Sequence, residues 1–309
     1  MQEGNFINPN HKEDLRFLES AIEKELGLTL TINKKTETGV SNEVHEATLD
    51  NKIVFIKKYE SSSSFEGEVF GYDLLRAKGI PVPNVITSKE NPQTIGSPIA
   101  VLSSVEGITI KDSNLSEEKK ELIYEEVGAL LRKIHEIKLE GFGKPTVVEG
   151  KLRGAFSTYE EYRRTEDINL QESTDFLLQQ GLLNTDEEEK LKKVREEILA
   201  LDFGPGSLLH GDLHDRHVFI TNDLITGIID IGGLKVGDPR FDIAMCLHFI
   251  KNEKLSEAFK KGYGELANDP VVKKYLLIII LRKIESRFNR TKEIKRETIE
   301  SLHQLLAEL

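Results

Sequence analysis

The sequence has a single cysteine, Cys246, and no tryptophan. One cysteine cannot form an internal disulfide, so disulfide-rich secreted scaffolds are excluded and the cytoplasm is the expected compartment. Long apolar runs are also missing, because the longest, YLLIIIL at residues 275–281, is far short of the roughly 20 residues that a membrane helix needs. The residues after Met1 are too polar for the apolar segment of a signal peptide. We therefore expect no membrane partner.

Positive charge is scarce. The chain has 42 Lys and Arg against 53 Asp and Glu, a formal net charge of −11, and no sizeable Lys/Arg cluster. Nucleic-acid binding needs a basic surface, so we expect no nucleic-acid partner. The acidity gathers in residues 155–189, which hold 10 Asp and Glu and 2 Arg. This region could attract a cationic small molecule, although residues 185–188 also fit a helix N-cap with a capping box and an acidic first turn.

At 309 residues, the chain is long enough for two domains with separate cores. Apolar periodicity in the first hundred residues predicts helices over 11–27 and 66–79, strands between and after them, and a polar loop at 61–65. The remainder is mostly helical and encloses a hairpin predicted from the strands HVFIT and ITGIIDI. The expected fold class is α+β, with a small β-rich domain at 1–104 and a large, mostly helical domain at 105–309.

Two aspartates eighteen residues apart, Asp212 and Asp230, are joined by this hairpin. Each follows an apolar run and begins a glycine-containing loop, so the hairpin could bring the two carboxylates side by side. One could orient a substrate hydroxyl, and the other could hold a magnesium ion on its oxygen atoms. Turn-forming aspartates with capping roles would give the same pattern, so these two residues alone leave both interpretations open.

The motifs around these aspartates resemble the aminoglycoside phosphotransferase superfamily, the kinase-like enzymes that phosphorylate small molecules. HGDLHDRHVF matches the family's catalytic loop at residues 210–212, and GIIDIGG places Asp230 where the family has its metal-binding aspartate. GDPRFDIA matches the family's G-D-P-x-x-D signature with Asp238 and Asp242. The resemblance implies a protein-kinase-like two-lobed fold, in which Asp212 is catalytic, Asp230 binds metal and Asp242 braces the catalytic loop.

The N-terminal part carries further matches. TGVSNEVHEA is similar to the family's phosphate-covering turn, which implies that Gly39, Ser41 and Asn42 bind nucleotide phosphates. VFIK resembles the kinase strand whose lysine binds the α- and β-phosphates. Lys57 fits this position better than Lys58, which should point to the other face of the strand.

Two more nucleotide contacts follow from the resemblance. Glu68, on the next predicted helix, would pair with Lys57, whereas the competing Glu66 cannot share its helix face. VLSSVEG resembles the linker between lobes that holds the adenine ring through backbone groups, which implies Ser103 and Val105 as binding positions. Residues 1–104 would then form the nucleotide-binding lobe, and the rest would carry the catalytic loop and the substrate-binding helices.

His217 departs from the family pattern, which usually has Asn five residues after the catalytic aspartate. A neutral imidazole nitrogen suits magnesium less well than an amide oxygen. His217 could ligate the ion directly, hold it through a water molecule, or leave Asp230 to carry it. The macrolide phosphotransferases of this superfamily have a similar histidine, so His217 is compatible with activity. It also adds some weight to a nucleotide-binding protein that transfers no phosphate.

Zinc is the main alternative metal. A site built from His210, His214 and His217 is disfavoured, because the spacing of the first two needs a helix that Gly211 and the flanking strands oppose. Cys246 fits a small buried core residue better than a zinc ligand or a nucleophile.

The resemblance implies a magnesium-dependent enzyme that transfers the γ-phosphoryl group of ATP or GTP to a hydroxyl of a small molecule. The acceptor would be an antibiotic of the aminoglycoside or macrolide type. A metabolite kinase acting on an amino alcohol is the alternative within this class, and a kinase-like nucleotide-binding protein without transfer activity is the alternative outside it. Without tryptophan, the sequence shows no identifiable aromatic wall for a flat substrate.

Overall fold

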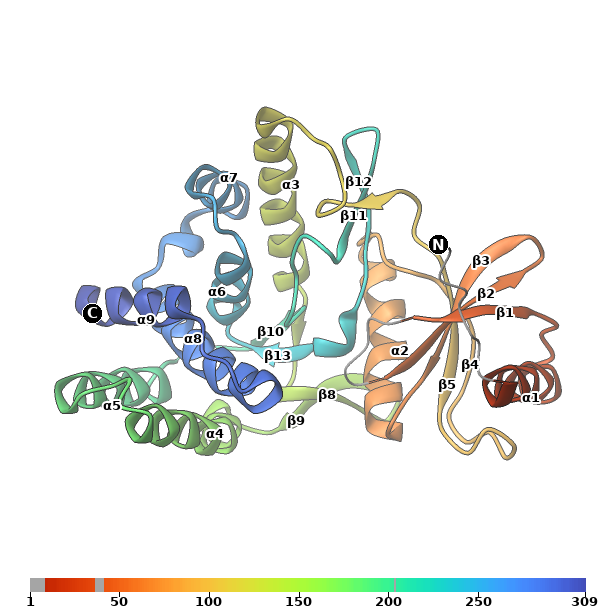
Figure 1. Ribbon diagram of the computed structural model, residues 1–309, viewed down its shortest axis with the longest axis horizontal. Helices are drawn as coiled ribbons and strands as arrows, with labels where there is room; N and C mark the ends of the chain where they lie inside the picture. The colour runs from red at the N-terminus through yellow and green to blue at the C-terminus, as the bar shows by residue number, and fades with distance from the viewer. Residues whose placement is uncertain (1–8, 37–41, 203) are drawn as a thin grey trace, which may run out of the picture. The chain divides into compact units, whose positions relative to one another are not determined.

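The computed structural model describes residues 9–36, 42–202 and 204–309. They form two compact units, shown in Figure 1, each with its own secondary structure. The first unit comprises residues 1–106 and 227–232, and the second comprises residues 107–226 and 233–309. The chain therefore returns to the first unit for one short segment, which contains Asp230.

A five-stranded antiparallel sheet forms the centre of the first unit. Its strand order is β1-β2-β3-β5-β4. The strands and the two helices of this unit have the following bounds: β1 Thr31–Lys35, β2 Glu43–Leu49, β3 Lys52–Lys58, β4 Val85–Lys89, β5 Ile99–Ser103, α1 Pro9–Leu26 and α2 Ser62–Ala77. A two-residue turn joins β2 to β3, and positive φ angles at Asp50 (49°) and Asn51 (61°) fit the type I′ geometry that hairpins favour.

Strand alternation gives β3 two different faces. Val54 and Ile56 point into an apolar core that includes Leu18 and Ile22 of α1. Lys57 follows Ile56 directly in the strand and therefore points to the opposite face, where it meets α2. The sequence pattern of β3 thus buries apolar side chains on one side and presents a lysine on the other.

The second unit combines seven α-helices with two small sheets among its described residues. One sheet has the order β7-β10-β13-β8-β9 and the other has the order β12-β11-β6, with β12 ending in the first unit. The strands are β6 Ile108–Thr109, β7 Lys138–Leu139, β8 Phe142–Val148, β9 Lys151–Phe156, β10 Gly206–Leu209, β11 Val218–Thr221, β12 Leu224–Ile228 and β13 Lys235–Gly237. The helices are α3 Glu117–His135, α4 Tyr159–Gln179, α5 Thr185–Leu199, α6 Pro239–Phe249, α7 Glu253–Tyr263, α8 Pro270–Thr291 and α9 Arg296–Glu308.

Strand β10 positions the loop that follows it. All four of its residues are buried, and the strand pairs with β7 and β13 and packs against α3 and α6 (Figure 1). After the loop, β11 and β12 form the predicted hairpin, with positive φ angles at Asn222 (52°) and Asp223 (63°) in its two-residue turn. The loop at residues 210–217 is therefore held by sheet structure at both ends.

Two expectations about the elements need correction. Residues 61–65 are not a polar loop, because α2 begins at Ser62 and the Ser61 side chain caps it by accepting a hydrogen bond from the Ser64 amide. The capping box of α5 uses Asn184 as its N-cap, one residue before the predicted segment, together with Glu187. Within the described part of the chain, no helix is both long enough and apolar enough to cross a lipid bilayer.

Candidate active site

A buried ion pair joins β3 to α2 in the first unit. Lys57 Nζ donates to Glu68 Oε1 at 2.7 Å, and the two residues are only 7% and 3% exposed. Burial raises the pKa of Glu68, and the charge and hydrogen bond of Lys57 oppose this rise. Lys58 points elsewhere and pairs with Glu43 at 2.9 Å. The predicted pairing of Lys57 with Glu68, rather than with Glu66, is confirmed.

Asp230 lies near this pair, as the surroundings of Gly232 show. A Cβ atom built on Gly232 would lie 3.4 Å from Glu68 Oε2, 3.6 Å from Lys57 Nζ and 3.6 Å from Asp230 Oδ1. The charged groups of Lys57, Glu68 and Asp230 thus lie around Gly232, which has no side chain to separate them. Asp230 has a φ of 61°, a left-handed conformation that is uncommon for residues other than glycine and often marks functional segments.

Only some of the other predicted nucleotide contacts lie among the described residues. Asn42 lies immediately before β2, while Gly39 and Ser41 lie outside the described residues. Ser103 ends β5, and its backbone N–H donates to the Asn84 carbonyl oxygen at 2.9 Å. Val105 packs where a Cβ on Gly227 would collide with it, so the glycine lets the 227–232 segment approach this residue closely.

In the second unit, Asp242 holds the start of the predicted catalytic loop. Its carboxylate is fully buried and accepts hydrogen bonds from the backbone N–H groups of His210 at 2.7 Å and Gly211 at 2.9 Å. It also lies 3.1 Å from Nε2 of His135, whose Nδ1 is 2.7 Å from the hydroxyl of Tyr263. Burial would raise the pKa of Asp242, but His135, His210 and the Gly211 amide together hold it below its ordinary value. The expected bracing role is confirmed.

Gly211 is required at the next position. Its φ is +83°, and a Cβ there would collide with the carbonyl oxygen of Gly233. The chain can therefore turn sharply between the braced His210 and Asp212.

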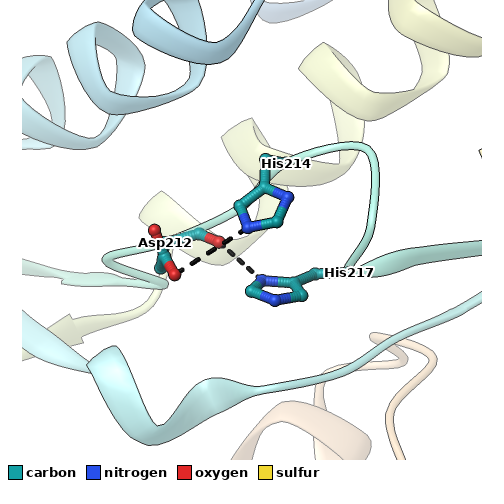
Figure 2. Close-up of side chains that lie close together, drawn as sticks. All are labelled: Asp212, His214 and His217. Atoms are coloured by element: carbon teal, nitrogen blue, oxygen red, sulfur yellow. Dashed lines mark hydrogen bonds and ion pairs between the residues drawn. The ribbon is translucent and has the colours of Figure 1, made fainter. Parts of the chain in front are cut away.

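The carboxylate of Asp212 projects from this braced backbone into solvent, with 39% of its side chain exposed. Its backbone N–H donates to His210 Nδ1 at 3.4 Å, and its carbonyl oxygen accepts a hydrogen bond from His217 Nδ1 at 2.8 Å (Figure 2). The main chain of Asp212 is thus fixed on both sides while its carboxylate stays accessible. This arrangement suits a group that must meet a substrate in one orientation.

Asp238, the other aspartate of the family signature, has a structural place. It is buried, caps α6 through the Arg240 amide, and accepts a hydrogen bond from the Tyr275 hydroxyl at 3.0 Å. Its ion pair with the Arg240 side chain at 2.8 Å neutralises its charge.

The three-histidine zinc site is not assembled. Among the described residues, the one group of three metal-binding side chains within 4.8 Å of one another is Asp212, His214 and His217, and it leaves out His210. Cys246 is buried in α6, as expected of a core residue, and burial raises the pKa of its thiol.

Three residues in these arrangements were not predicted. His135 and Tyr263 support Asp242 from α3 and α7, and Gly232 makes room beside Asp230. A histidine next to Ile134 on an otherwise apolar helix face was a signal for the first, and the glycine pair in GIIDIGG was a signal for the third. The sequence around Tyr263 gives no comparable sign.

Comparison with known proteins agrees with this geometry. The profile of the phosphotransferase enzyme family matches residues 35–275. An aminoglycoside 3'-phosphotransferase from Enterococcus faecalis is 24% identical over 247 residues, covering 75% of this chain and 85% of the relative. A thermostable mutant of aminoglycoside phosphotransferase APH(4)-Ia, solved with ADP and hygromycin B, superposes with a TM-score of 0.67 at 16% identity over 95% of this chain and 97% of that one.

A GDP complex of aminoglycoside 2'-phosphotransferase-IIIa gives a TM-score of 0.64 at 15% identity, with 98% of both chains covered. The predicted α+β, protein-kinase-like fold is therefore confirmed. The family match covers well over half of the chain and includes the braced loop and the lysine–glutamate pair. This chain belongs to the phosphotransferase enzyme family and has the kinase-like fold of the aminoglycoside phosphotransferases.

Proposed function

We propose that this protein transfers the γ-phosphoryl group of ATP or GTP to a hydroxyl of a small-molecule antibiotic of the aminoglycoside class. The observation that carries the proposal is the loop in which buried Asp242 fixes the backbone beneath the accessible carboxylate of Asp212. Family membership supports the reaction type. The complexes of similar proteins with ADP, GDP and hygromycin B support a nucleotide donor and an antibiotic acceptor. The proposed compartment is the cytoplasm, where nucleoside triphosphates are abundant.

Asp212 is the proposed catalytic base. Its carboxylate would orient the acceptor hydroxyl and take its proton as the oxygen attacks the γ-phosphorus. The bond from the γ-phosphorus to the bridging oxygen breaks, and the nucleoside diphosphate leaves with that oxygen. Because the main chain of Asp212 is held at both its N–H and its carbonyl group, the carboxylate needs little reorganisation to act.

Lys57 is the proposed ligand of the α- and β-phosphates. Its buried ion pair with Glu68 fixes the side chain in one orientation, so its charge is in place before the nucleotide binds. Gly39, Ser41 and Asn42 remain the predicted phosphate contacts, and Ser103 and Val105 the predicted adenine contacts. The Ser103 amide already donates to Asn84, so the base would have to use the Ser103 carbonyl or the backbone of Val105.

Magnesium is the proposed metal cofactor, and the residues fit it unequally. Asp230 offers carboxylate oxygens, the ligand type that magnesium prefers. His217 offers Nε2, because its Nδ1–H donates to the Asp212 carbonyl oxygen, and an imidazole nitrogen suits magnesium less well. A bound ion would neutralise the charge on the phosphates. Asp230 is therefore the principal ligand in this proposal, and His217 contributes directly or through a water molecule.

The acidic stretch bears on the choice of acceptor. Aminoglycosides are cationic, and residues 155–189 carry excess negative charge in α4, α5 and their connection. Part of this charge already has a structural partner: Glu160 pairs with Arg164, Glu187 closes the capping box, and Glu188 pairs with Lys192. The remaining excess supports a cationic acceptor through long-range attraction rather than through a defined contact.

A macrolide is the second candidate acceptor. The observation that favours it is His217, which stands where the macrolide phosphotransferases have a similar histidine.

A transfer assay with a panel of acceptors tests the proposal. ATP and GTP would be offered in turn with magnesium and with aminoglycosides, macrolides or amino alcohols, and mass spectrometry would detect the added phosphate on the acceptor. We expect phosphorylated aminoglycoside with wild-type protein and none with Asp212→Ala. Phosphorylation of only amino alcohols would replace the antibiotic assignment with a metabolite kinase, and nucleotide binding without any transfer would contradict the proposed reaction.

A further inference from the structure

Asp212, His214 and His217 share a feature that the proposed reaction does not use. Each presents one ligand atom suited to a metal, and these atoms all lie within 4.8 Å of one another. Asp212 Oδ2 and His214 Nε2 are 3.9 Å apart, and Figure 2 shows both imidazole rings beside Asp212. We propose that these three side chains bind a borderline transition-metal cation, Zn²⁺ foremost, and that its binding blocks phosphoryl transfer. The blocking step rests on the proposed function, whereas the metal site does not.

The hydrogen bonds of His217 favour metal binding. Its Nδ1 lies 2.8 Å from the Asp212 carbonyl oxygen, which can only accept, so Nδ1 carries the proton. In a neutral ring, the lone pair is then on Nε2. A backbone carbonyl that fixes the tautomer in this way is the usual partner of a metal-binding histidine.

His214 lies beside the Asp215 carboxylate, a kind of partner that metal-binding histidines use. Its Nδ1 accepts a hydrogen bond from the Arg216 amide at 3.2 Å and lies 3.6 Å from Asp215 Oδ1. When Nε2 binds a metal, Nδ1 must carry the proton, so it gives up the hydrogen bond from the Arg216 amide and donates to the Asp215 carboxylate instead. The Asp215–His214–metal arrangement would match the carboxylate–histidine–zinc chain seen at many zinc sites.

The loop holds the two rings together before any metal arrives. The His217 N–H donates to the His214 carbonyl oxygen at 2.9 Å, which closes a tight turn, and the ring centroids are 3.8 Å apart. Ile110 and Lys111 tie the outer side of the turn through backbone hydrogen bonds to Val218 and Asp215. A tetrahedral site with bonds of about 2.0 Å needs ligands about 3.3 Å apart, so small side-chain rotations would close the cluster.

The chemistry of the three ligands selects the metal. Two imidazole nitrogens and one carboxylate oxygen suit Zn²⁺ better than Mg²⁺, which prefers oxygen and an octahedral shell. Three protein ligands with a fourth, open position are a common zinc arrangement. With 39% of the Asp212 side chain and 12% of the His214 side chain exposed, solvent can supply the fourth ligand and the ion can enter.

A metal ion bound at this site would stop the proposed reaction by occupying the catalytic base, Asp212. A carboxylate oxygen of Asp212 bound to Zn²⁺ cannot take the proton of an acceptor hydroxyl. The His217 Nε2 would also be withdrawn from magnesium. Zn²⁺ would therefore inhibit phosphate transfer. Its inhibitory concentration would depend on its affinity for the three-residue site and not on competition for the nucleotide.

Cobalt provides a test that does not depend on activity. The full chain, freed of metal with a chelator, is titrated with Co²⁺, and its visible absorption is recorded before and after Zn²⁺ is added. We expect one equivalent of Co²⁺ with tetrahedral absorption bands that Zn²⁺ abolishes. His214→Gln and Asp212→Asn should each weaken Co²⁺ binding about 10-fold or more. His248→Gln is the matched control, because His248 also contacts Phe249 but lies outside the cluster, and it should bind as wild type does.

Absence of the bands in wild type, or equal binding by His214→Gln, overturns the site. Far-ultraviolet circular dichroism of each variant separates lost binding from lost folding. Phosphate transfer by each protein is then measured with and without Zn²⁺. Inhibition should shift in His214→Gln by the same factor as Co²⁺ affinity, and Zn²⁺-insensitive transfer in wild type overturns the blocking step. A protein that binds Co²⁺ as expected but transfers no phosphate retains the metal site and contradicts the proposed function.

Discussion

At the scale of single residues, the ion pair between Lys57 and Glu68 combines structure with function. Both side chains are buried, and each compensates the other's charge in a place where an unpaired charge is costly. The pair could be predicted from the sequence because the spacing of VFIK and the following helix resembles the family, and strand alternation excluded Lys58. The nearness of Asp230 to the Lys57–Glu68 pair could not be predicted from local patterns, because it depends on where the 227–232 segment joins the first unit.

Loss of one partner should therefore destabilise the fold. We expect Glu68→Ala to lower the free energy of unfolding by about 3–5 kcal/mol, because it leaves Lys57 buried without its counter-charge. Urea denaturation measures this change, with Glu66→Ala, two residues away on the same helix, as the control. Equal effects of the two substitutions would show that the pair contributes nothing specific.

Asp242 should give the protein a specific acid sensitivity. Its folded-state pKa is lowered, so its carboxylate stabilises the fold fully above its unfolded pKa of about 3.9 and loses that effect as the pH falls through the folded value. We expect the stability difference between wild type and Asp242→Asn to be constant above about pH 5 and to shrink below about pH 4. Urea denaturation across this range measures the difference, with exposed Asp73→Asn as the control. A difference that grows as the pH falls would contradict the sign of this pKa shift.

At the scale of elements, local sequence patterns predicted a helix and a hairpin whose formation depends mainly on neighbouring residues. The helical period of α1 and the β11–β12 hairpin were predicted close to their observed bounds. The serine run at 61–65 misled, because serine is common in loops, yet Ser61 serves as an N-cap and the following serines form the first turn of α2. The β8–β9 hairpin was not predicted, although its two-residue turn at Glu149 and Gly150 is local; only its pairing with β13 involves residues far away in the sequence.

The turn after β10 provides a test at this scale. Gly211→Ala should be more destabilising than an ordinary substitution at positive φ, because its Cβ also collides with the Gly233 carbonyl oxygen. Gly150→Ala is the matched control: its φ is +74°, but nothing lies within 4 Å of the added Cβ. We expect Gly150→Ala to cost about 1–2 kcal/mol and to keep transfer activity, and Gly211→Ala to cost more and to lose most of it. Equal losses of stability and activity would show that the sharp turn is not needed.

At the scale of the whole molecule, the family resemblance predicted the kinase-like fold correctly. What it could not supply is the acceptor, because that depends on side chains outside the matched motifs. The closeness of Asp212 to His214 and His217 was also missed, because the histidines of this loop were grouped with one another and not with the aspartate.

Nucleotide binding should stabilise the whole chain. A ligand present at 100 times its Kd adds about 2.7 kcal/mol to the free energy of unfolding, so ATP or GTP with magnesium should raise the Tm. We expect Lys57→Met to lose most of this increase and Lys58→Met to keep it, since Lys58 pairs with Glu43 instead. Differential scanning calorimetry measures the shift, and an unchanged shift in Lys57→Met would remove Lys57 from the nucleotide site.

The most direct test of the central claim is the rate of phosphate transfer in Asp212→Asn. Removing a catalytic base should lower kcat by about 10²–10⁴-fold, because base catalysis contributes on this order. Nucleotide affinity, measured in parallel by calorimetry, should stay close to that of wild type, and Asp215→Asn in the same loop should retain transfer. This result would establish Asp212 as the base of a phosphotransferase. An Asp212→Asn protein that transfers phosphate at a rate close to that of wild type would contradict the account.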